Sequence, residues 1–364
     1  MSAKKKILMV GSVPPPFHGQ SIAFKSALDA LQDCDIFLVE ASFRSGGVAG
    51  SVIKIISYFI RVFYGVAIFR PKIVYFLCSR SAIGSFRDIY LLALTYFFPI
   101  KVFNHLHGSD FKDMFLSSPK WKRWLMRKLY SKVCKHVVLV EGMQEQFQCL
   151  YLPLETIVIP NYYSREANKY LPSKKPSSKN LSIVYLSSVI KSKGILELIE
   201  AVDILVDNDC DVKLRVAGGF LGDDEMTTKE IKKEFYRSIS GKNYIDYLGV
   251  ISAGEKFKLL ARSQVFVLPS YYVSEAIPLS IIEAMRMGCY VIVSNYKYLP
   301  SLVEDQVNGS LVQIRNPEDI HSKIKCVYDN RNLLERVGLN NIRYSAENFS
   351  EDSYQQNIRN LLLG

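Results

Sequence analysis

The chain has 364 residues, of which 49% are hydrophobic and 22% charged, and its formal net charge is +11. This length is about twice that of one typical domain, and the composition excludes an intrinsically disordered protein. The seven cysteines form no CxxC pair, which argues against a zinc site or disulfide framework and favours reduced thiols. The positive charge leaves three kinds of partner open: nucleic acid, an anionic membrane surface, and phosphate-bearing substrates.

Short β-rich segments alternate with helical segments through the first half of the chain. Strands are predicted at 5–12, 34–41, 72–79, 100–108 and 136–142, and helices at 20–31, 52–69, 86–98 and 120–133. The strands are nearly continuous apolar runs, which is typical of a parallel sheet covered on both faces. The first strand follows a basic start but ends at a Pro/Gly cluster, so we do not interpret it as a signal peptide.

A polar stretch over residues 161–180, rich in Lys, Ser and Pro, interrupts this pattern and is interpreted as an interdomain linker. The pattern then restarts, with strands predicted at 181–188, 213–219, 244–250, 265–270 and 290–295, and helices at 195–206, 228–236, 254–261, 277–287 and 350–363. Two successive βα arrays predict an α/β chain with two Rossmann-like, doubly wound domains, whose strand ends can face a central cleft.

The most informative segment is FVLPSYYVSEAIPLSIIEAMRMGCYVIVSN, residues 266–295, in which a strand, a loop and a helix follow each other. If the helix begins at Ile277, its first-turn amides are free donors at the positive end of the helix dipole, which suits a diphosphate. Glu275 would then accept hydrogen bonds from sugar hydroxyls, and Glu283 from a ribose diol. Taken without context, the simpler interpretation is structural, with Glu275 a helix cap and Glu283 an ordinary helical residue.

The same segment resembles the paired-glutamate signature of retaining, two-domain (GT-B) nucleotide-sugar glycosyltransferases, the glycosyl transferases group 1 or family 4-like enzymes. The matching residues are Glu275, Pro278, Leu279, Glu283, Ala284, Met285 and Gly288, followed by VIVSN. Residues 186–202 and 298–312 resemble further segments of that family, so the likeness runs through nearly the entire chain. It implies the GT-B fold, with an acceptor-binding domain over 1–165, a nucleotide-sugar-binding domain over 166–345, and a C-terminal helix over 346–364 that can pack back on the first domain.

The resemblance assigns a donor site to the second domain. Lys193 matches a family lysine on the donor diphosphate, but Ser188 stands where a basic residue usually precedes it by five positions. Lys191 is an alternative source of that charge. The expected donor-binding residues are Gly19, Ser188, Lys193, Leu248, Gly249, Val250, Ser274, Glu275, Ala276, Ile277, Pro278, Leu279, Ser280 and Glu283.

In the first domain, Gly19 lies where the family has a glycine-rich loop that approaches the donor phosphates. His107 matches a family histidine near the donor sugar, while a lone histidine at a strand end is more often structural. The resemblance therefore implies Glu275, Lys193 and His107 as catalytic residues. It places His18, His107, Gly108 and Asp110 on the acceptor side, with His18 and His105 the weaker histidine candidates.

The implied function is transfer of a hexosyl or related sugar, with retention, from a UDP- or GDP-linked donor to a glycan or lipid-linked acceptor. Bacterial surface polysaccharide synthesis, including lipopolysaccharide or capsule, would use such an enzyme. No metal and no cofactor are expected, because the family generally needs none. The expected location is the cytoplasm, or the cytoplasmic face of the inner membrane.

The basic segment 120–135, with Trp121 and Trp124, predicts either contact with an anionic membrane or a solvated helix face. We expect no membrane-spanning segment, because Lys54 and Arg61 interrupt the apolar run at 52–69. Two other classes of function stay open: a non-catalytic nucleotide-sugar-binding protein of the same fold, and a basic nucleic-acid-binding protein. The second is disfavoured because the cations are dispersed apart from one helix and no nucleic-acid-binding motif is present. An oxidoreductase or an epimerase on the same sheet architecture is disfavoured because no dinucleotide loop follows any strand.

Overall fold

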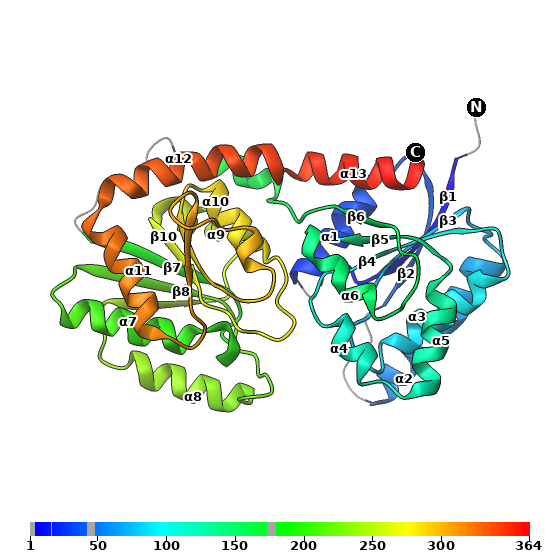
Figure 1. Cartoon of the computed structure of the whole chain (residues 1–364), viewed down its shortest axis with the longest axis horizontal. Coiled ribbons are helices and arrows are strands. Elements are labelled where there is room, and N and C mark those ends of the chain that lie inside the picture. Colours follow the sequence, from blue (N-terminus) through cyan, green and yellow to red (C-terminus); the bar gives the residue numbers. More distant parts are fainter. Residues whose placement is uncertain (1–3, 16, 42–47, 173–179) are drawn as a thin grey trace. The chain divides into compact units, whose positions relative to one another are not determined.

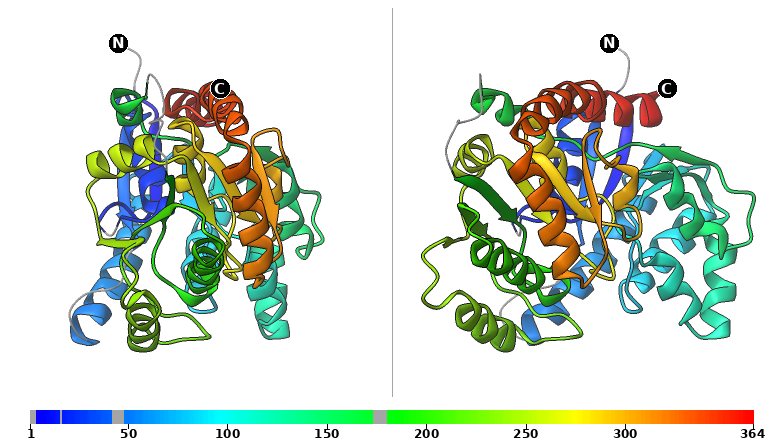
Figure 2. Two further views of the ribbon diagram at one scale, coloured as in Figure 1. Left: turned by 90° about the vertical axis from the view of Figure 1, so that its left-hand side faces the viewer. Right: turned by 60° about the vertical axis from the view of Figure 1, so that its left-hand side comes forward.

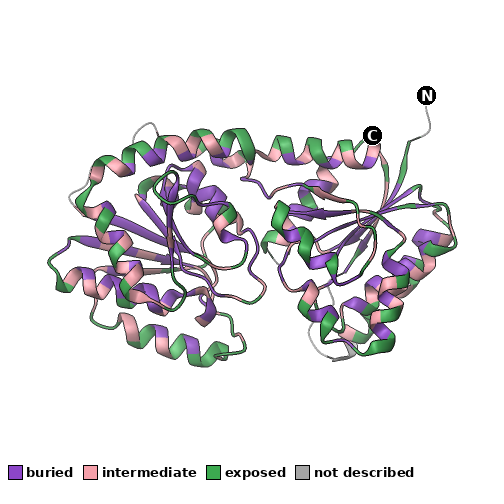
Figure 3. Cartoon of the chain, viewed as in Figure 1, coloured by how far each residue is buried: buried purple, intermediate pink, exposed green. Residues whose placement is uncertain are grey.

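The computed structural model describes residues 4–15, 17–41, 48–172 and 180–364. The chain divides into two compact units, one formed by residues 1–160 and 352–364 and the other by residues 161–351 (Figure 1). Each unit holds one six-stranded parallel sheet, and the strands of both sheets are largely buried (purple in Figure 3).

The sheet of the first unit has the strand order β2-β1-β3-β4-β5-β6. Its strands are β1 (Lys6–Gly11), β2 (Asp35–Glu40), β3 (Ile73–Leu77), β4 (Lys101–His105), β5 (Val133–Val138) and β6 (Thr156–Val158). The apolar runs noted in the sequence form the buried strands β1, β3 and β4, because both faces of a parallel sheet are covered by helices.

The helices of the first unit divide between the two faces of its sheet. They are α1 (Gly19–Asp29), α2 (Val48–Ala67), α3 (Ser85–Tyr96), α4 (Phe111–Leu116), α5 (Lys120–Tyr130), α6 (Glu145–Gln148) and most of α13 (Glu351–Leu363), with a 3-10 turn η1 (Glu141–Gln144). The connection through α1 runs in the opposite direction along the sheet from those through α2, α3 and α5. Because such crossovers are right-handed, α1 lies on one face and the other three lie on the opposite face (Figure 1).

Helix α13 packs on α1 after the chain returns to the first unit at Asp352. The Tyr354 hydroxyl donates to the Ala23 carbonyl at 3.0 Å, and Arg359 forms an ion pair with Asp33 at 2.6 Å. The C-terminal helix is thus an integral part of the first unit.

The sheet of the second unit has the order β12-β11-β10-β7-β8-β9. Its strands are β7 (Leu181–Leu186), β8 (Val212–Ala217), β9 (Ile245–Gly249), β10 (Val265–Leu268), β11 (Tyr290–Ser294) and β12 (Gly309–Val312). The surrounding helices are α7 (Ile195–Asp207), α8 (Thr228–Ile239), α9 (Ala253–Arg262), α10 (Leu279–Arg286), α11 (Pro317–Asp329) and α12 (Arg331–Asn348), with 3-10 turns η2 (Arg165–Tyr170), η3 (Lys191–Lys193) and η4 (Leu299–Ser301). Two further views of the elements are given in Figure 2.

Each sheet has one point where the direction of winding reverses. In the first unit, β2 and β3 follow β1 in sequence but flank it on opposite sides; in the second, β8 and β10 flank β7 in the same way. The loops that leave the two strands at such a point diverge, and they leave a crevice at the carboxyl ends of the strands. The topology therefore nominates the loops after β1 and β3, and those after β7 and β10, as binding loops.

Two expectations from the sequence need correction. The segment interpreted as a linker is in part ordered, since Tyr162 and Tyr163 are buried and Tyr170 of η2 stacks on Phe257 of α9. The remainder of that segment, residues 173–179, lies outside the described residues. The helix expected from Ile277 begins instead at Leu279, because Pro278 has extended backbone angles and forms the N-cap.

Judged by length and composition alone, helix α2 is long and apolar enough to cross a membrane. Only 22% of its Gly50–Ala67 window is buried. Its two cations, Lys54 and Arg61, do not exclude α2 as a candidate membrane-spanning helix, contrary to the expectation from the sequence. The same criteria are met equally by core helices of soluble proteins, but such helices are mostly buried.

Three histidines lie in the interior of the first unit. Burial holds the pKa of His105 well below its ordinary value and lowers the pKa of His107 and of His136 to about 3. His136 lies between the rings of Tyr130 and Phe147, and neither of its ring nitrogens has a hydrogen-bond partner. Burial keeps all three imidazoles neutral, because it disfavours the charged form of a histidine.

We expect acid to destabilise the first unit through His136. Between an unfolded pKa near 6.5 and a folded pKa of about 3, the unfolded chain binds one more proton, so stability falls as the pH falls. Between pH 8 and pH 5 this amounts to about 2 kcal/mol for one histidine. His136→Phe should remove that part of the loss. Denaturant unfolding followed by fluorescence of Trp121 and Trp124, the two tryptophans of the chain, reports on this unit. Equal pH slopes for the two proteins would contradict the expectation.

Candidate functional site

A buried ion pair joins the two diverging loops of the second unit. Lys193, at the end of η3 after β7, donates to the Glu275 carboxylate at 2.6 Å, and both side chains are largely buried. The Ser270 hydroxyl, directly after β10, donates to the same carboxylate oxygen at 2.5 Å. The Lys193 ammonium also lies 4.9 Å from the centre of the Tyr272 ring. The two residues that the sequence singled out most strongly thus meet at the switch point of the sheet.

Gly194 allows the two loops to approach this closely. Its φ of +76° is left-handed, and an added Cβ would lie 2.3 Å from the Pro269 carbonyl oxygen. Any side chain here would therefore push the η3 loop away from the end of β10. Since Lys193 directly precedes Gly194, its position depends on this contact.

The loop from Ser274 to Pro278 separates Glu275 from α10. Glu275 is not at the helix N-terminus as expected, because it lies four residues before the first helical residue, Leu279. Its carboxylate is bound by side chains and does not cap the helix. Among the described residues, no acceptor is paired with the N–H of Leu279 or of Ser280, and both residues are partly exposed. Ala276 and Ile277 are buried behind them.

These two amides point to an anion site. Free N–H groups at the start of a helix carry the positive end of the helix dipole. Asn161 fixes this end of α10 from the start of the unit, because its amide donates to the Ile277 carbonyl at 2.6 Å. The helix start that the sequence analysis predicted to bind a diphosphate thus lies two residues later, at Leu279.

Glu283 has a lysine partner of its own. Its carboxylate is buried on α10 and accepts from Lys256 of α9 at 2.5 Å. Burial raises the pKa of Glu283, and the neighbouring Lys256 opposes that rise. The expected hydrogen bonds from Glu283 to a ribose diol would replace or extend this pairing. Lys256 is a residue that the sequence analysis missed.

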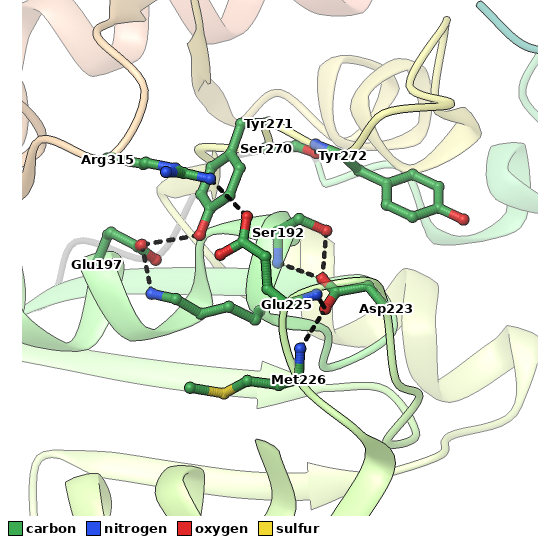
Figure 4. A network of polar contacts seen from close by, with 10 residues as sticks. Ser192, Glu197, Asp223, Glu225, Met226, Ser270, Tyr271, Tyr272 and Arg315 are labelled. Carbon is green, nitrogen blue, oxygen red and sulfur yellow. Dashed lines mark hydrogen bonds and ion pairs between the residues drawn. The ribbon is translucent and has the colours of Figure 1, made fainter. Parts of the chain in front are cut away.

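A second polar network, drawn in Figure 4, anchors the η3 loop to the loop that follows β8. Asp223 accepts from the backbone N–H of Ser192 at 2.9 Å and from its hydroxyl at 2.6 Å. Burial tends to raise the pKa of Asp223, but hydrogen bonds from Ser192 and from the backbone at 225 and 226 lower it overall. These bonds anchor the residue immediately before Lys193.

Lys191 is engaged in the same network. Its ammonium pairs with Glu197 at 2.7 Å, and the Tyr271 hydroxyl donates to the same carboxylate oxygen at 3.1 Å. The charge of Lys191 is therefore balanced within the protein. It is a poor substitute for the basic residue that Ser188 replaces, and Ser188 contributes only its carbonyl, which accepts from Tyr185 at 3.0 Å.

The residues expected near the base lie at the end of β9. Leu248 and Val250 are exposed, and Gly249 has a φ of +67° with nothing within 4 Å of an added Cβ. Gly218, at the end of the adjacent β8, donates its N–H to the Gly249 carbonyl at 2.8 Å. This places an open apolar surface beside the same strand ends.

The first unit has its own polar cluster at its switch point. Arg80, after β3, donates to Asp110 at 2.8 Å and contacts Gln20 of α1 at 3.5 Å. An added Cβ on Gly108 would lie 2.1 Å from the Arg80 guanidinium, so the arginine rests directly on this glycine. The sequence analysis missed Arg80, although it directly follows the strand predicted at 72–79.

His107 lies in this cluster with both ring nitrogens buried and without a hydrogen-bond partner. Its ring centre is 4.0 Å from that of His105, whose Nδ1 is 2.6 Å from the Tyr75 hydroxyl. Burial first, and then the charge of Arg80, lower the pKa of His107 to about 3, so it is a neutral imidazole near neutral pH. His107 can therefore offer a neutral donor or acceptor to a ligand, while His105 is held within the core.

His18 has a structural role in the described structure. It is the N-cap of α1, where its Nδ1 accepts from the Ser21 N–H at 3.1 Å and Ser21 bonds back to its backbone. Gly19 is the exposed first residue of that helix. A capped Nδ1 leaves the ring proton on Nε2.

The structure thus brings together Lys193 and Glu275 in the second unit, and the amides of Leu279 and Ser280 begin four residues after Glu275 in the chain. In the first unit it brings together His107, Gly108 and Asp110, with Gly19 next to the Gln20 that contacts Arg80. Ser270, Asp223, Lys256 and Arg80 were missed. Asp223 could have been found from the sequence, because it begins the acidic run at 223–225 that follows the two glycines after β8. Among the described residues, no group of three or more His, Cys, Asp or Glu side chains is placed to hold a metal ion.

The two parallel six-stranded sheets have the GT-B fold of two Rossmann-like domains. Anabaena HepE in complex with UDP-glucose has a TM-score of 0.73 to this chain at 16% identity, with 98% of each chain covered. Residues 167–344 match the family model described as Glycosyl transferases group 1. The second unit therefore contains a glycosyl transferases group 1 domain.

Two curated relatives are similar to part of this chain. An N,N'-diacetylbacillosaminyl-diphospho-undecaprenol alpha-1,3-N-acetylgalactosaminyltransferase of Campylobacter jejuni is 25% identical over 201 residues, which cover 55% of this chain and 47% of the relative. A poly(ribitol-phosphate) alpha-N-acetylglucosaminyltransferase of Staphylococcus aureus is 29% identical over 178 residues, covering 49% of this chain and 34% of the relative. The chain thus matches less than half the length of these relatives.

Gly194→Ala should displace Lys193, because alanine is strained at the left-handed φ of this position and its Cβ would overlap the Pro269 carbonyl. Gly241→Ala is the matched control, since Gly241 has the same φ of +76° with nothing within 4 Å of an added Cβ. Both variants should lose about 1 kcal/mol of stability from the left-handed backbone. Only Gly194→Ala should also weaken UDP binding in calorimetry, by about tenfold or more. Equal UDP affinities in the two variants would show that Gly194 does not position the site.

Proposed function

We propose that this protein is a glycosyltransferase that moves a hexosyl or related sugar from a nucleotide diphosphate sugar to a glycan or lipid-linked acceptor, with retention of anomeric configuration. The observation that carries the proposal is the Lys193–Glu275 pair at the switch point of the group 1 domain. A cation, a carboxylate and open helix amides at one sheet edge are the groups that a sugar diphosphate requires.

The donor would bind with its diphosphate at the amides of Leu279 and Ser280. An anion placed there competes with Glu275 for the Lys193 ammonium. Once Lys193 turns to the phosphate, the Glu275 carboxylate is free to accept hydrogen bonds from sugar hydroxyls. One ion pair would in this way supply both a phosphate ligand and a sugar ligand.

Catalysis would then consist mainly of stabilising the departing diphosphate. Fixed amides and a lysine in a partly buried site act on that charge without reorganisation. We propose that these groups carry the charge without a metal ion. In the proposed mechanism no protein side chain removes the acceptor proton, and the departing phosphate takes it.

UDP is the nucleotide we favour, because HepE, which shares the fold, is described in complex with UDP-glucose. The names of the two relatives, an undecaprenol-linked saccharide transferase and a poly(ribitol-phosphate) transferase, support a cell-surface glycan as the acceptor class. We propose that His107, Gly108 and Asp110 of the first unit contact the acceptor. A cytoplasmic location, where nucleotide sugars are made, fits this reaction.

A non-catalytic nucleotide-sugar-binding protein is the second candidate. It is favoured by Ser188, which carries no charge, and by Lys191, which is already paired with Glu197. Such a protein would bind the same donors without consuming them. The experiment that follows separates the two.

Glu275→Gln and Lys193→Met should each lower turnover of the preferred donor by about 100-fold or more, as removal of one charge-stabilising group does in other enzymes. The measurement is UDP or GDP release from a panel of UDP- and GDP-sugars, with and without lipid extract. Addition of a chelator should leave the rate unchanged.

Asp203→Asn is the matched control, because Asp203 of α7 pairs with Lys242 at 2.5 Å in the same unit. Lys242 precedes β9, so this pair lies away from the carboxyl ends of the strands. This variant should retain wild-type turnover. Turnover of Glu275→Gln within a few-fold of wild type would contradict the proposed site. Donor binding without release in any mixture would favour the non-catalytic protein.

A further inference from the structure

Helix α2 carries apolar side chains on both of its sides. Tyr58, Val62 and Val66 face the interior and are buried. The opposite side is nevertheless also apolar, and Ile53 and Ile60 are each more than 60% exposed. The other exposed apolar residues of this helix and its end are Val52, Ile55, Ile56, Phe63, Tyr64 and Ile68. A surface helix normally carries polar residues on its outer side, so this face requires a partner.

The inner side of α2 is packed closely against the sheet of the first unit. An added Cβ on Gly65 would lie 2.9 Å from Leu8 of β1, and Arg61 donates to the Leu38 carbonyl at 2.7 Å. The helix is therefore part of the domain and is not free to insert across a bilayer. Its outer side can only lie along a surface.

Helices α3 and α5 extend the apolar face of α2. The three helices lie in one layer on the same side of the sheet, with α3 in contact with both of its neighbours (Figure 1). Phe86 of α3 lies 6.3 Å from Trp121 of α5, and Trp121 and Trp124 are both exposed. Phe97, at the end of α3, is 84% exposed. The patch thus runs across three helices and has aromatic residues at its margin.

The charges on this face are almost all positive. Lys54 and Arg61 of α2 are exposed, as are Lys120 and Lys128 of α5, and Arg123 and Arg127 are partly exposed. Lys122 of α5 is buried and donates to the Ala82 carbonyl at 2.7 Å, so it does not contribute to the outer face. The only acidic residue of the three helices is Asp88. Asp88 is buried and accepts hydrogen bonds from Ser79 and Tyr130. Lys120 and Lys128 are exposed beside the two tryptophans. The field at this surface therefore attracts anions.

We propose that the outer face of α2, α3 and α5 docks the first unit on an anionic lipid bilayer. The side chains of α2 enter the boundary between headgroups and acyl chains, the tryptophans lie at the interface, and the α5 cations contact the lipid phosphates. A bilayer fits better than a protein partner, because it matches an apolar face that runs from Val52 to Ile68 and has a cationic and aromatic rim. This inference does not depend on the proposed transferase activity.

Vesicle sedimentation with the full chain tests the proposal without donor or acceptor. The protein should bind vesicles of phosphatidylcholine and phosphatidylglycerol more tightly than vesicles of phosphatidylcholine alone, and high salt should weaken the binding. Lys120→Glu/Arg123→Glu/Lys128→Glu should weaken binding to the anionic vesicles by about 100-fold. Ile53→Ser/Ile56→Ser/Ile60→Ser should weaken it by about tenfold or more.

Two control variants change the second unit to the same extent. Lys229→Glu/Lys232→Glu/Lys233→Glu reverses three cations of α8, and Val307→Ser/Ile314→Ser/Leu339→Ser removes three exposed apolar side chains. Both should bind vesicles as the wild type does, and all four variants should keep the wild-type unfolding midpoint. Equal binding to neutral and anionic vesicles, no binding, or equal losses in the controls would overturn the proposal. A dimer in sedimentation velocity that only the triple isoleucine variant abolishes would assign the face to a second copy, and would also overturn it.

Discussion

The ion pair between Lys193 and Glu275 organises the candidate donor site. Two charges taken out of water are costly unless each is balanced and hydrogen-bonded, and here a single carboxylate is bound by both a lysine and the Ser270 hydroxyl. The pair fixes the loop after β7 against the loop after β10, and Gly194 makes room for that contact. A ligand anion at the neighbouring amides can exchange one of these partners without leaving a buried charge alone.

The position of this pair follows from the winding of the sheet. Both units reverse direction beside their first strand, at β1 and β7, and in both a cation in one of the diverging loops binds a carboxylate at the same end of the sheet. In the first unit these are Arg80 with Asp110 and Gln20; in the second they are Lys193 with Glu275. The strands beside these loops, β1, β3, β7 and β10, are apolar and largely buried, and the loops at their carboxyl ends carry Arg80, Lys193 and Glu275.

Much of this arrangement could be predicted from the sequence. Alternation of apolar strands and helices correctly predicted two doubly wound α/β domains, since parallel strands buried on both faces leave a clear pattern, and the family resemblance correctly implied the GT-B fold. The paired glutamates led to the group 1 domain, which the family match confirms. The start of α10 was misplaced because the extended backbone of Pro278 delays the helix. Arg80 and Lys256 were not predicted, because their roles depend on contacts between residues that are distant in the chain, and no local pattern marks such contacts. The exposed side of α2 could not be predicted either, because periodicity alone does not distinguish a buried apolar helix from an uncovered one.

The most direct test of the account is a crystal structure of the protein with UDP. We predict that the diphosphate binds at the Leu279 and Ser280 amides, and that the Lys193 ammonium moves from Glu275 to a phosphate oxygen while Ser270 stays on the carboxylate. A structure in which UDP is bound elsewhere, or in which the Lys193–Glu275 pair is unchanged beside a bound diphosphate, would contradict the central role of this ion pair.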